Sequence, residues 1–196
     1  MMWLPTLLRK RESAIPFIPK DFAYLPNDKY LLYDSAWRGL DALIPELIQK
    51  FNIPTNKCLE FGVEFGFSTT VFANYFKDVV GVDIFTGDSH AGLHDDDYKD
   101  MIDKVKPWPN IKLIKADYKD YIKNNNEKFD LIHVDIIHNY KETFECGLWA
   151  AEHSKMAIFH DTKSFKGVKH AVQDIATKTG KTFHNYQYNN GLGILV

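Results

Sequence analysis

After Pro54, short apolar runs alternate along the chain with segments whose apolar residues recur at helical spacing. A short apolar run bounded by turn residues is typical of a buried strand, whereas a recurrence every three to four residues is typical of a helix. Strands that alternate with helices form parallel sheets through right-handed crossovers. The sequence therefore predicts an α/β fold with a doubly wound, mostly parallel sheet of seven strands. We expect the strands at Lys57–Phe61, Val79–Ile84, Ile111–Lys115, Phe129–Val134, Met156–Phe159, Thr182–Tyr188 and Leu192–Val196.

Turn residues separate the last two predicted strands and indicate a hairpin. Asn189, Asn190 and Gly191 tolerate positive φ, which short hairpin turns require. This hairpin would add one antiparallel strand to the sheet. Between the earlier strands, helices are expected from about Ser68 to Tyr75 and over Tyr118–Lys123, Tyr140–Glu152 and Lys166–Thr179.

The chain before Pro54 divides into an arm and a helix. Residues 1–34 are rich in proline and aromatic residues without a regular period, so we expect an arm that wraps the domain, with a frayed tail as the alternative. The aromatic residues expected to pack are Trp3, Phe17, Phe22 and Tyr24. From Ser35, helical spacing predicts an amphipathic helix, which Pro45 should break or kink, or where a second helix should start. Residues 35–196 are expected to form one domain.

Composition excludes several classes of protein. The 196 residues include 24 Lys and Arg against 26 Asp and Glu, so the net charge of −2 argues against a bulk electrostatic grip on nucleic acid or acidic membranes. No run of 18 uninterrupted apolar residues is present, and the N-terminal pattern does not resemble a signal peptide. We therefore expect a cytoplasmic protein. Cys58 and Cys146, in apolar surroundings, are expected to be reduced core residues.

Acidic residues follow every predicted parallel strand. In a doubly wound sheet, ligands bind beyond the carboxyl ends of the strands. A carboxylate at each of these ends is not expected from random placement, so this edge of the sheet is predicted to be a ligand site. The residues concerned are Glu60, Asp83, Asp117, Asp135 and Asp161.

The first of these strand ends runs into a glycine turn with the spacing E-x-G-x-x-x-G. Gly62 and Gly66 allow the backbone to approach a ligand closely, and Ser68 or Thr69 can cap the helix that follows. The spacing differs from the G-x-G-x-x-G pattern with which dinucleotide-binding proteins hold a pyrophosphate.

Carboxylates around this turn favour a cationic ligand. Glu60 precedes the turn and Glu64 lies within it, so both would repel a pyrophosphate and attract positive charge. Asp83 follows 17 residues after Gly66, near the offset expected of an acid that binds ribose hydroxyls. A nucleoside with a cationic tail meets both conditions, and S-adenosylmethionine meets them better than NAD. The alternative is a structural turn with surface carboxylates.

These segments carry a family resemblance. Leu59–Ser68 together with Val80–Asp83 resembles motifs I and II of class I S-adenosylmethionine-dependent methyltransferases. The resemblance implies that the two glycines lie against the methionine end of the cofactor and that the motif II acid holds the ribose. It also implies that the residues after the third strand flank the adenine. The expected cofactor-binding residues are Glu60, Gly62, Gly66, Ser68, Asp83, Asp117 and Tyr118.

The ends of the fourth and fifth strands bring acids and histidines together. Asp135 and His138 follow one strand, and His160 and Asp161 end the next, whereas His133 lies within a strand and is expected in the core. Two or three oxygen ligands suit Mg²⁺ or another divalent cation such as Mn²⁺, which could lower the pKa of a substrate hydroxyl. One of the histidines could instead act as a general base. A third interpretation is that the two aspartates cap helices and the histidines bond them.

A second resemblance concerns this half of the chain. Val134–Tyr140 and Ile158–Thr162 are similar to the D-x-x-H-x-Y and F-H-D-T elements of a small-molecule and sugar O-methyltransferase branch, and Gly87–Gly92 is similar to its G-D-x-H-A-G segment. Metal-dependent relatives, including catechol O-methyltransferase, carry metal-binding acids at positions that match Asp135 and Asp161. Thr162 departs from the amide ligand of the catechol enzymes.

The function expected from these residues is transfer of a methyl group from S-adenosylmethionine to a hydroxyl of a small molecule or sugar. Catalytic candidates are His90, His138 and His160, and metal candidates are Asp135 and Asp161. The alternatives are an NAD-linked oxidoreductase and a non-catalytic S-adenosylmethionine-binding module. A nucleic-acid methyltransferase is disfavoured, because the chain lacks a basic stripe and an N/D-P-P-Y/F element. A homo-oligomer is compatible with the sequence.

Overall fold

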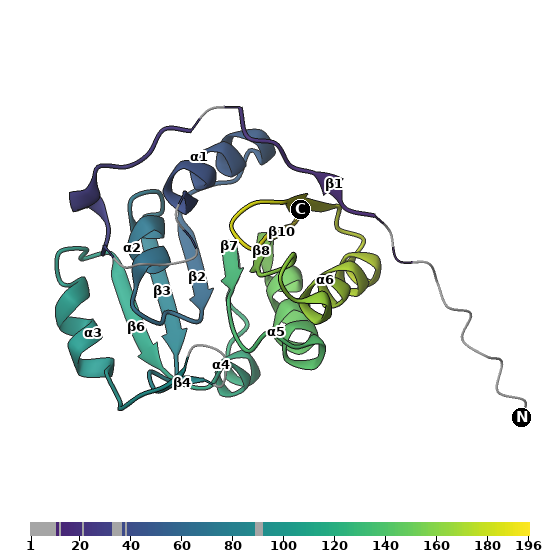
Figure 1. The fold of residues 1–196 in the computed structure, drawn as a ribbon. Helices are drawn as coiled ribbons and strands as arrows, with labels where there is room; N and C mark the ends of the chain where they lie inside the picture. Colours follow the sequence, from purple (N-terminus) through teal and green to yellow (C-terminus); the bar gives the residue numbers. More distant parts are fainter. Residues whose placement is uncertain (1–10, 12, 21, 33–36, 38, 89–91) are drawn as a thin grey trace, which may run out of the picture.

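An eight-stranded sheet forms the centre of the protein (Figure 1). The computed structural model describes residues 11, 13–20, 22–32, 37, 39–88 and 92–196. The strand order of the sheet is β1-β9-β10-β8-β7-β2-β3-β6. The strands are β1 Ile15–Pro16, β2 Lys57–Phe61, β3 Asp78–Asp83, β6 Ile111–Lys115, β7 Phe129–Val134, β8 Ser154–His160, β9 Phe183–Tyr186 and β10 Leu192–Leu195. A separate ribbon pairs β4 Gly87–Asp88 with β5 Gly92–Leu93.

The topology confirms the doubly wound α/β prediction. Strands β6, β3, β2, β7 and β8 pair in parallel, and β10 is antiparallel to both β8 and β9. The hairpin forms through Asn189, Asn190 and Gly191, all of which have positive φ. The sheet has eight strands rather than the predicted seven, because Ile15 and Pro16 of the arm pair in parallel with β9. This pairing covers a strand edge that would otherwise expose unpaired backbone groups.

Helices cover both faces of the sheet. Neighbouring residues of a strand point to opposite faces. Cys58 and Leu131 therefore join α1 (Leu40–Phe51) and α2 (Phe67–Ala73) on one face, whereas Leu59 and Ile132 join α5 (Tyr140–His153) and α6 (Lys166–Thr179) on the other. Both cysteines are buried and free, as predicted. Within the described residues, no helix is both long and apolar enough to span a membrane. The helices are η1 Asn27–Lys29, α1 Leu40–Phe51, α2 Phe67–Ala73, α3 Tyr98–Val105, α4 Tyr118–Asn124, α5 Tyr140–His153 and α6 Lys166–Thr179.

Helix α1 continues through Pro45, so neither the predicted break nor the start of a second helix at this proline occurs. Proline has no N–H and would leave the carbonyl of Asp41, four residues earlier, without its helical hydrogen bond. The hydroxyl of Tyr75 donates to this carbonyl at 2.6 Å and replaces the missing bond. Burial and the nearby Asp41 charge raise the pKa of Tyr75 to about 12, so the hydroxyl keeps its proton at physiological pH.

The described part of the arm packs against the domain only in places. In Figure 1 it runs from β1 past α1 towards α2, where the backbone N–H of Leu31 donates to Thr70. Phe17 is buried as predicted, but Phe22 and Tyr24 are 43% and 66% exposed and stack on each other. Exposure of these two rings contradicts the expectation that they pack the core. Trp3 and the predicted boundary at residues 34 and 35 lie outside the described residues.

Candidate active site

A cavity of about 600 Å³ opens at the carboxyl ends of the parallel strands. Its volume lies within the range of about 300–1,000 Å³ that is usual for small-molecule sites. Of the predicted site residues, nine line it: Gly62, Ser68, Asp83, Asp117, Tyr118, Asp135, His138, His160 and Asp161. Glu60 and Gly66 are not among the lining residues, and His90 lies outside the described residues.

Asp83 organises the glycine turn. One oxygen of its carboxylate accepts from the backbone N–H groups of Val63 and Glu64, at 2.7 and 2.9 Å, and the other accepts from Phe85 at 2.7 Å. Gly62 has a φ of +91°, and a Cβ there would lie 1.8 Å from the carbonyl oxygen of Asp135. The turn therefore passes directly against the end of β7 and needs glycine at this position. The sequence assigned Asp83 to a ligand, and this structural role was missed.

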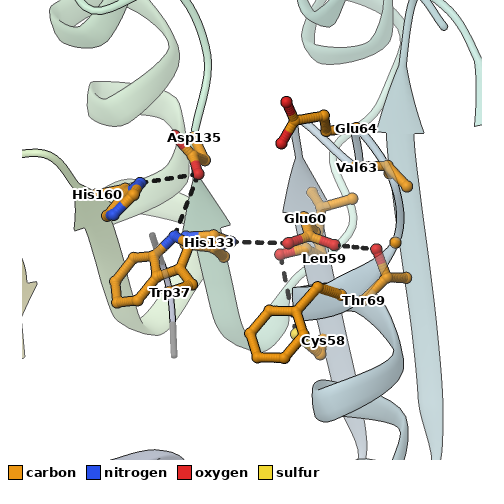
Figure 2. Close-up of polar contacts among 12 residues, drawn as sticks. Trp37, Cys58, Leu59, Glu60, Val63, Glu64, Thr69, His133, Asp135 and His160 are labelled. Atoms are coloured by element: carbon orange, nitrogen blue, oxygen red, sulfur yellow. Dashed lines mark hydrogen bonds and ion pairs between the residues drawn. The ribbon is translucent and has the colours of Figure 1, made fainter. Parts of the chain in front are cut away.

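Glu60 is buried within the fold rather than facing the cavity. It is completely inaccessible, accepts a hydrogen bond from the hydroxyl of Thr69, and lies 2.9 Å from Nδ1 of His133 (Figure 2). The pleat of β2 directs Glu60 to the same face as Cys58, towards α2. The prediction that Glu60 contacts the cofactor is therefore corrected, whereas the prediction that His133 belongs to the core is confirmed.

Helix α2 begins without a side-chain cap. Gly66, at φ +78°, occupies the N-cap position, and Phe67 is the first helical residue. Ser68 therefore lies inside the first turn, where it lines the cavity, and Thr69 bonds Glu60 instead of the helix end. The prediction that Ser68 or Thr69 caps this helix is wrong. Gly66 packs closely against the core, because a Cβ at this position would lie 2.7 Å from the side chain of Met101.

Asp117 and Tyr118 form another wall of the cavity. Asp117 caps α4 by accepting from the backbone N–H of Lys119 at 2.8 Å. The hydroxyl of Tyr118 donates to Glu142, which also pairs with the Lys119 ammonium at 2.8 Å. Burial and the Glu142 carboxylate raise the pKa of Tyr118, so its ring remains neutral.

Four side chains from the ends of β7 and β8 meet in one cluster. Asp135 lies 3.2 Å from Nε2 of His138 through one oxygen and 3.0 Å from Nδ1 of His160 through the other. Asp161 lies 2.9 Å from the same Nε2 of His138. A ligand atom from each of the four side chains lies within 4.8 Å of the others. The structure thus gathers the residues that the sequence placed on neighbouring strand ends.

Neither aspartate caps a helix with its side chain. Asn139 caps α5 by accepting from the backbone N–H of Glu142, and α6 begins after Phe165 without a side-chain cap. The interpretation of Asp135 and Asp161 as helix caps is therefore wrong, although the accompanying bonds to the histidines do form.

Residues 59–162 match a protein family that is described as a methyltransferase domain. The chain belongs to this methyltransferase-domain family. This match confirms the predicted enzyme class, a methyltransferase. No curated protein sequence matches the chain.

Solved structures share the fold at low sequence identity. An O-methyltransferase from Bacillus cereus in complex with SAH is 16% identical with a TM-score of 0.61, and the match covers 81% of each chain. TomG from Streptomyces achromogenes, an O-methyltransferase involved in tomaymycin synthesis and bound to SAM, is 13% identical with a TM-score of 0.59 over 80% of this chain and 78% of its own. Magnesium protoporphyrin IX methyltransferase from Synechocystis, with bound SAM, is 14% identical with a TM-score of 0.56 over 80% and 76%. These likenesses confirm the fold.

Within this methyltransferase domain, the cluster holds a proton on His138. Burial lowers the pKa of this imidazole, but hydrogen bonds and charge from Asp135 and Asp161 outweigh burial and raise it to about 10. Burial raises the pKa of Asp135, but the neighbouring His160 and His138 outweigh it and hold that pKa well below its usual range. At neutral pH His138 is therefore an imidazolium beside the ionised carboxylate of Asp135.

The donor set of the methyltransferase domain also fits a divalent cation. Two carboxylates and two imidazoles converge, and a cation there would replace the proton that His138 carries. Imidazole ligands suit Fe²⁺ or Zn²⁺ better than Mg²⁺, which favours oxygen ligands. Nε2 of His160 is buried without a hydrogen-bond partner among the described residues. Only the two aspartates were predicted as metal ligands from the sequence, and the two histidines were missed in this role.

A pH dependence of stability follows from the raised pKa of His138. Since the folded pKa of about 10 exceeds the unfolded value of 6.5, this group stabilises the fold fully below pH 6.5 and progressively less as the pH rises to about 10. In protein dialysed against EDTA, we expect His138→Gln to flatten the fall in the free energy of unfolding over this interval, as measured by urea denaturation. His153→Gln, whose ring bonds the Trp149 carbonyl outside the cavity, is the control. If the free energy of unfolding falls with pH as steeply in His138→Gln as in the native chain, the raised pKa of His138 is contradicted.

Proposed function

We propose that this methyltransferase domain transfers the methyl group of S-adenosylmethionine to a hydroxyl oxygen of a small molecule. The observation that carries the proposal is the charge of the cavity. Among the described lining residues, Lys119 is the one lysine or arginine against six carboxylates. These are Glu64, Asp83, Asp117, Asp135, Glu142 and Asp161. Such a cavity attracts the sulfonium and ammonium groups of S-adenosylmethionine and repels the pyrophosphate of NAD.

The cofactor is assigned to the wall that the glycine turn and α4 form. Gly62 and Ser68 lie where the backbone can approach the methionine end. Asp83 is proposed to hold a ribose hydroxyl, because its Oδ1 accepts one backbone N–H, that of Phe85, and has a second lone pair. Asp117 and Tyr118 are proposed to flank the adenine.

The acceptor is assigned to the wall that carries the four-residue cluster. An acceptor oxygen attacks the sulfonium methyl, a C–O bond forms as the C–S bond breaks, and the acceptor proton leaves to a base. We assign this base to His160, because His138 already carries a proton and Nε2 of His160, on a ring that lines the cavity, has no hydrogen-bond partner among the described residues. A divalent cation held by the cluster would instead lower the pKa of the acceptor hydroxyl itself.

The acceptor wall favours an apolar small molecule. Ile136, Ile137 and Phe165 line the cavity around the cluster. Burial of apolar surface against such side chains would supply most of the affinity. A sugar acceptor remains the alternative and would need polar partners on this wall.

The first test is ligand discrimination by calorimetry. We expect S-adenosylhomocysteine to bind and NADH not to bind, and we expect methyl transfer from labelled S-adenosylmethionine to a member of a panel of small hydroxyl compounds. Binding of NADH without binding of S-adenosylhomocysteine would contradict the proposal.

The second test of the cofactor site compares two variants, Asp83→Ala and Asp78→Asn, at the two ends of β3. Asp83→Ala removes the carboxylate that is proposed to bind the ribose, together with the acceptor for three backbone N–H groups. Since one hydrogen bond to a charged acceptor contributes about 1.5–3 kcal/mol, loss of the ribose bond should raise the dissociation constant of S-adenosylhomocysteine roughly 10- to 100-fold. Asp78→Asn changes the exposed first residue of the strand and should bind normally. Equal affinities in the two variants would remove Asp83 from the cofactor site.

A further inference from the structure

Trp37 precedes α1 in the chain, yet its indole reaches the ends of β7 and β8. The side chain is 3% exposed, and it lines the cavity. Its Nε1–H donates to Asp135 at 3.2 Å, and its ring stacks on His160 with centroids 3.8 Å apart and planes at 27° (Figure 2). Both contacts involve members of the four-residue cluster.

The indole determines how the Asp135 carboxylate is turned. The same oxygen, Oδ2, lies 3.2 Å from Nε1 of Trp37 and 3.0 Å from Nδ1 of His160. The other oxygen, Oδ1, is left facing His138. Loss of the indole N–H would remove one of the two contacts that hold Oδ2 and would free the carboxylate to rotate.

The indole also contacts a firmly held residue of the core, His133. Its ring meets His133 in an edge-on contact with centroids 5.7 Å apart. His133 is anchored to Glu60, and Glu60 is anchored to Thr69 of α2. The Glu60–His133 pair is completely buried, so the surface behind Trp37 has little freedom to move.

We propose that Trp37 is a positioning residue that holds the Asp135 carboxylate and the His160 ring in the orientation that methyl transfer requires. The inference rests on the proposed function of the cluster. Tryptophan suits the role because it combines a large flat face for stacking with an N–H donor. Phenylalanine keeps the face and lacks the donor, so Trp37→Phe separates the two contributions.

The test compares Trp37→Phe with Trp149→Phe. Trp149 also stacks on a histidine, His153, at 4.2 Å, but neither residue lines the cavity. In Trp37→Phe we expect kcat to fall roughly 10- to 100-fold, as is usual when a partner that orients an active-site ligand is lost, with the KM for S-adenosylmethionine unchanged. In Trp149→Phe we expect both constants to remain at the values of the native chain.

A second readout does not depend on activity. Nitrogen-15 NMR of the imidazoles should show one sharp Nδ1–H form of His160 in the native chain and in Trp149→Phe, and mixed or broadened signals in Trp37→Phe. If Trp37→Phe does not fold, Trp37→benzothienylalanine keeps the bicyclic shape without the N–H and serves the same comparison.

The outcomes separate the two proposals. A native chain that neither binds S-adenosylhomocysteine nor transfers methyl groups overturns the proposed function, and the NMR comparison then decides the positioning role alone. An unchanged His160 spectrum in Trp37→Phe overturns the positioning role, as does an unchanged kcat in an active enzyme.

Discussion

Asp135→Asn is expected to lower kcat by roughly 100- to 10,000-fold, the range usual for loss of general acid–base catalysis, while S-adenosylhomocysteine binding changes little. Three donor groups, from Trp37, His138 and His160, converge on this carboxylate. An amide of the same shape carries one acceptor oxygen and turns an N–H₂ group towards donors. The charge that keeps His138 oriented is lost as well.

Steady-state kinetics and calorimetry on the same preparation check this result. The matched control is Asp130→Asn at the other end of β7, where the carboxylate accepts from the backbone N–H groups of Asn56 and Lys57. This control should lower the free energy of unfolding and leave kcat unchanged. If Asp135→Asn retains the native kcat, the reaction does not occur at this cluster.

Gly62→Ala is expected to impair stability and cofactor binding together. Its Cβ would lie 1.8 Å from the Asp135 carbonyl oxygen, an atom of the backbone that cannot move aside without shifting β7. Crowding of this kind costs about 1–3 kcal/mol, in addition to about 1–2 kcal/mol for a left-handed residue with a side chain. The displaced turn would also carry the N–H groups of Val63 and Glu64 away from Asp83.

Gly180→Ala isolates the contribution of backbone strain. Gly180 also has positive φ, at +73°, but a Cβ there meets nothing within 4 Å. Urea denaturation should therefore show a smaller loss than in Gly62→Ala, and affinity for S-adenosylhomocysteine should be preserved. Equal destabilisation of the two variants would show that the close approach at Gly62 is unimportant.

The regular part of the fold could be predicted from local patterns. The bounds of β2, β6, β7 and α6 agree with the predictions at every residue, because apolar runs and helical spacing are bounded there by strong turn residues. Strand β1 has only two residues, so no period could reveal it, and its existence depends on the free edge of β9. The course of α1 through Pro45 depends on Tyr75, 30 residues later in the chain.

The site could be predicted to the level of strand ends but not of side-chain direction. Asp135 and Asp161 follow adjacent parallel strands, so their proximity follows from topology alone. Glu60 precedes the end of its strand, and the pleat turns it into the core. The alternation of Cys58 and Glu60 against Leu59 was the signal that could have shown this. Trp37 had no such signal, because its place depends on how the chain enters α1.

The insertion of β10 between β8 and β9 sets the order in which the sheet can close. During synthesis, β9 leaves the ribosome before β10, yet it has no place in the sheet until β10 has paired with β8. The arm strand β1, which is made first, can dock only after both. A nascent chain stalled before Leu192 would present the bare edge of β8, an apolar strand open to pairing with other chains. The β9–β10 hairpin therefore protects the edge of β8, and the arm strand β1 protects the edge of β9, from pairing with other chains.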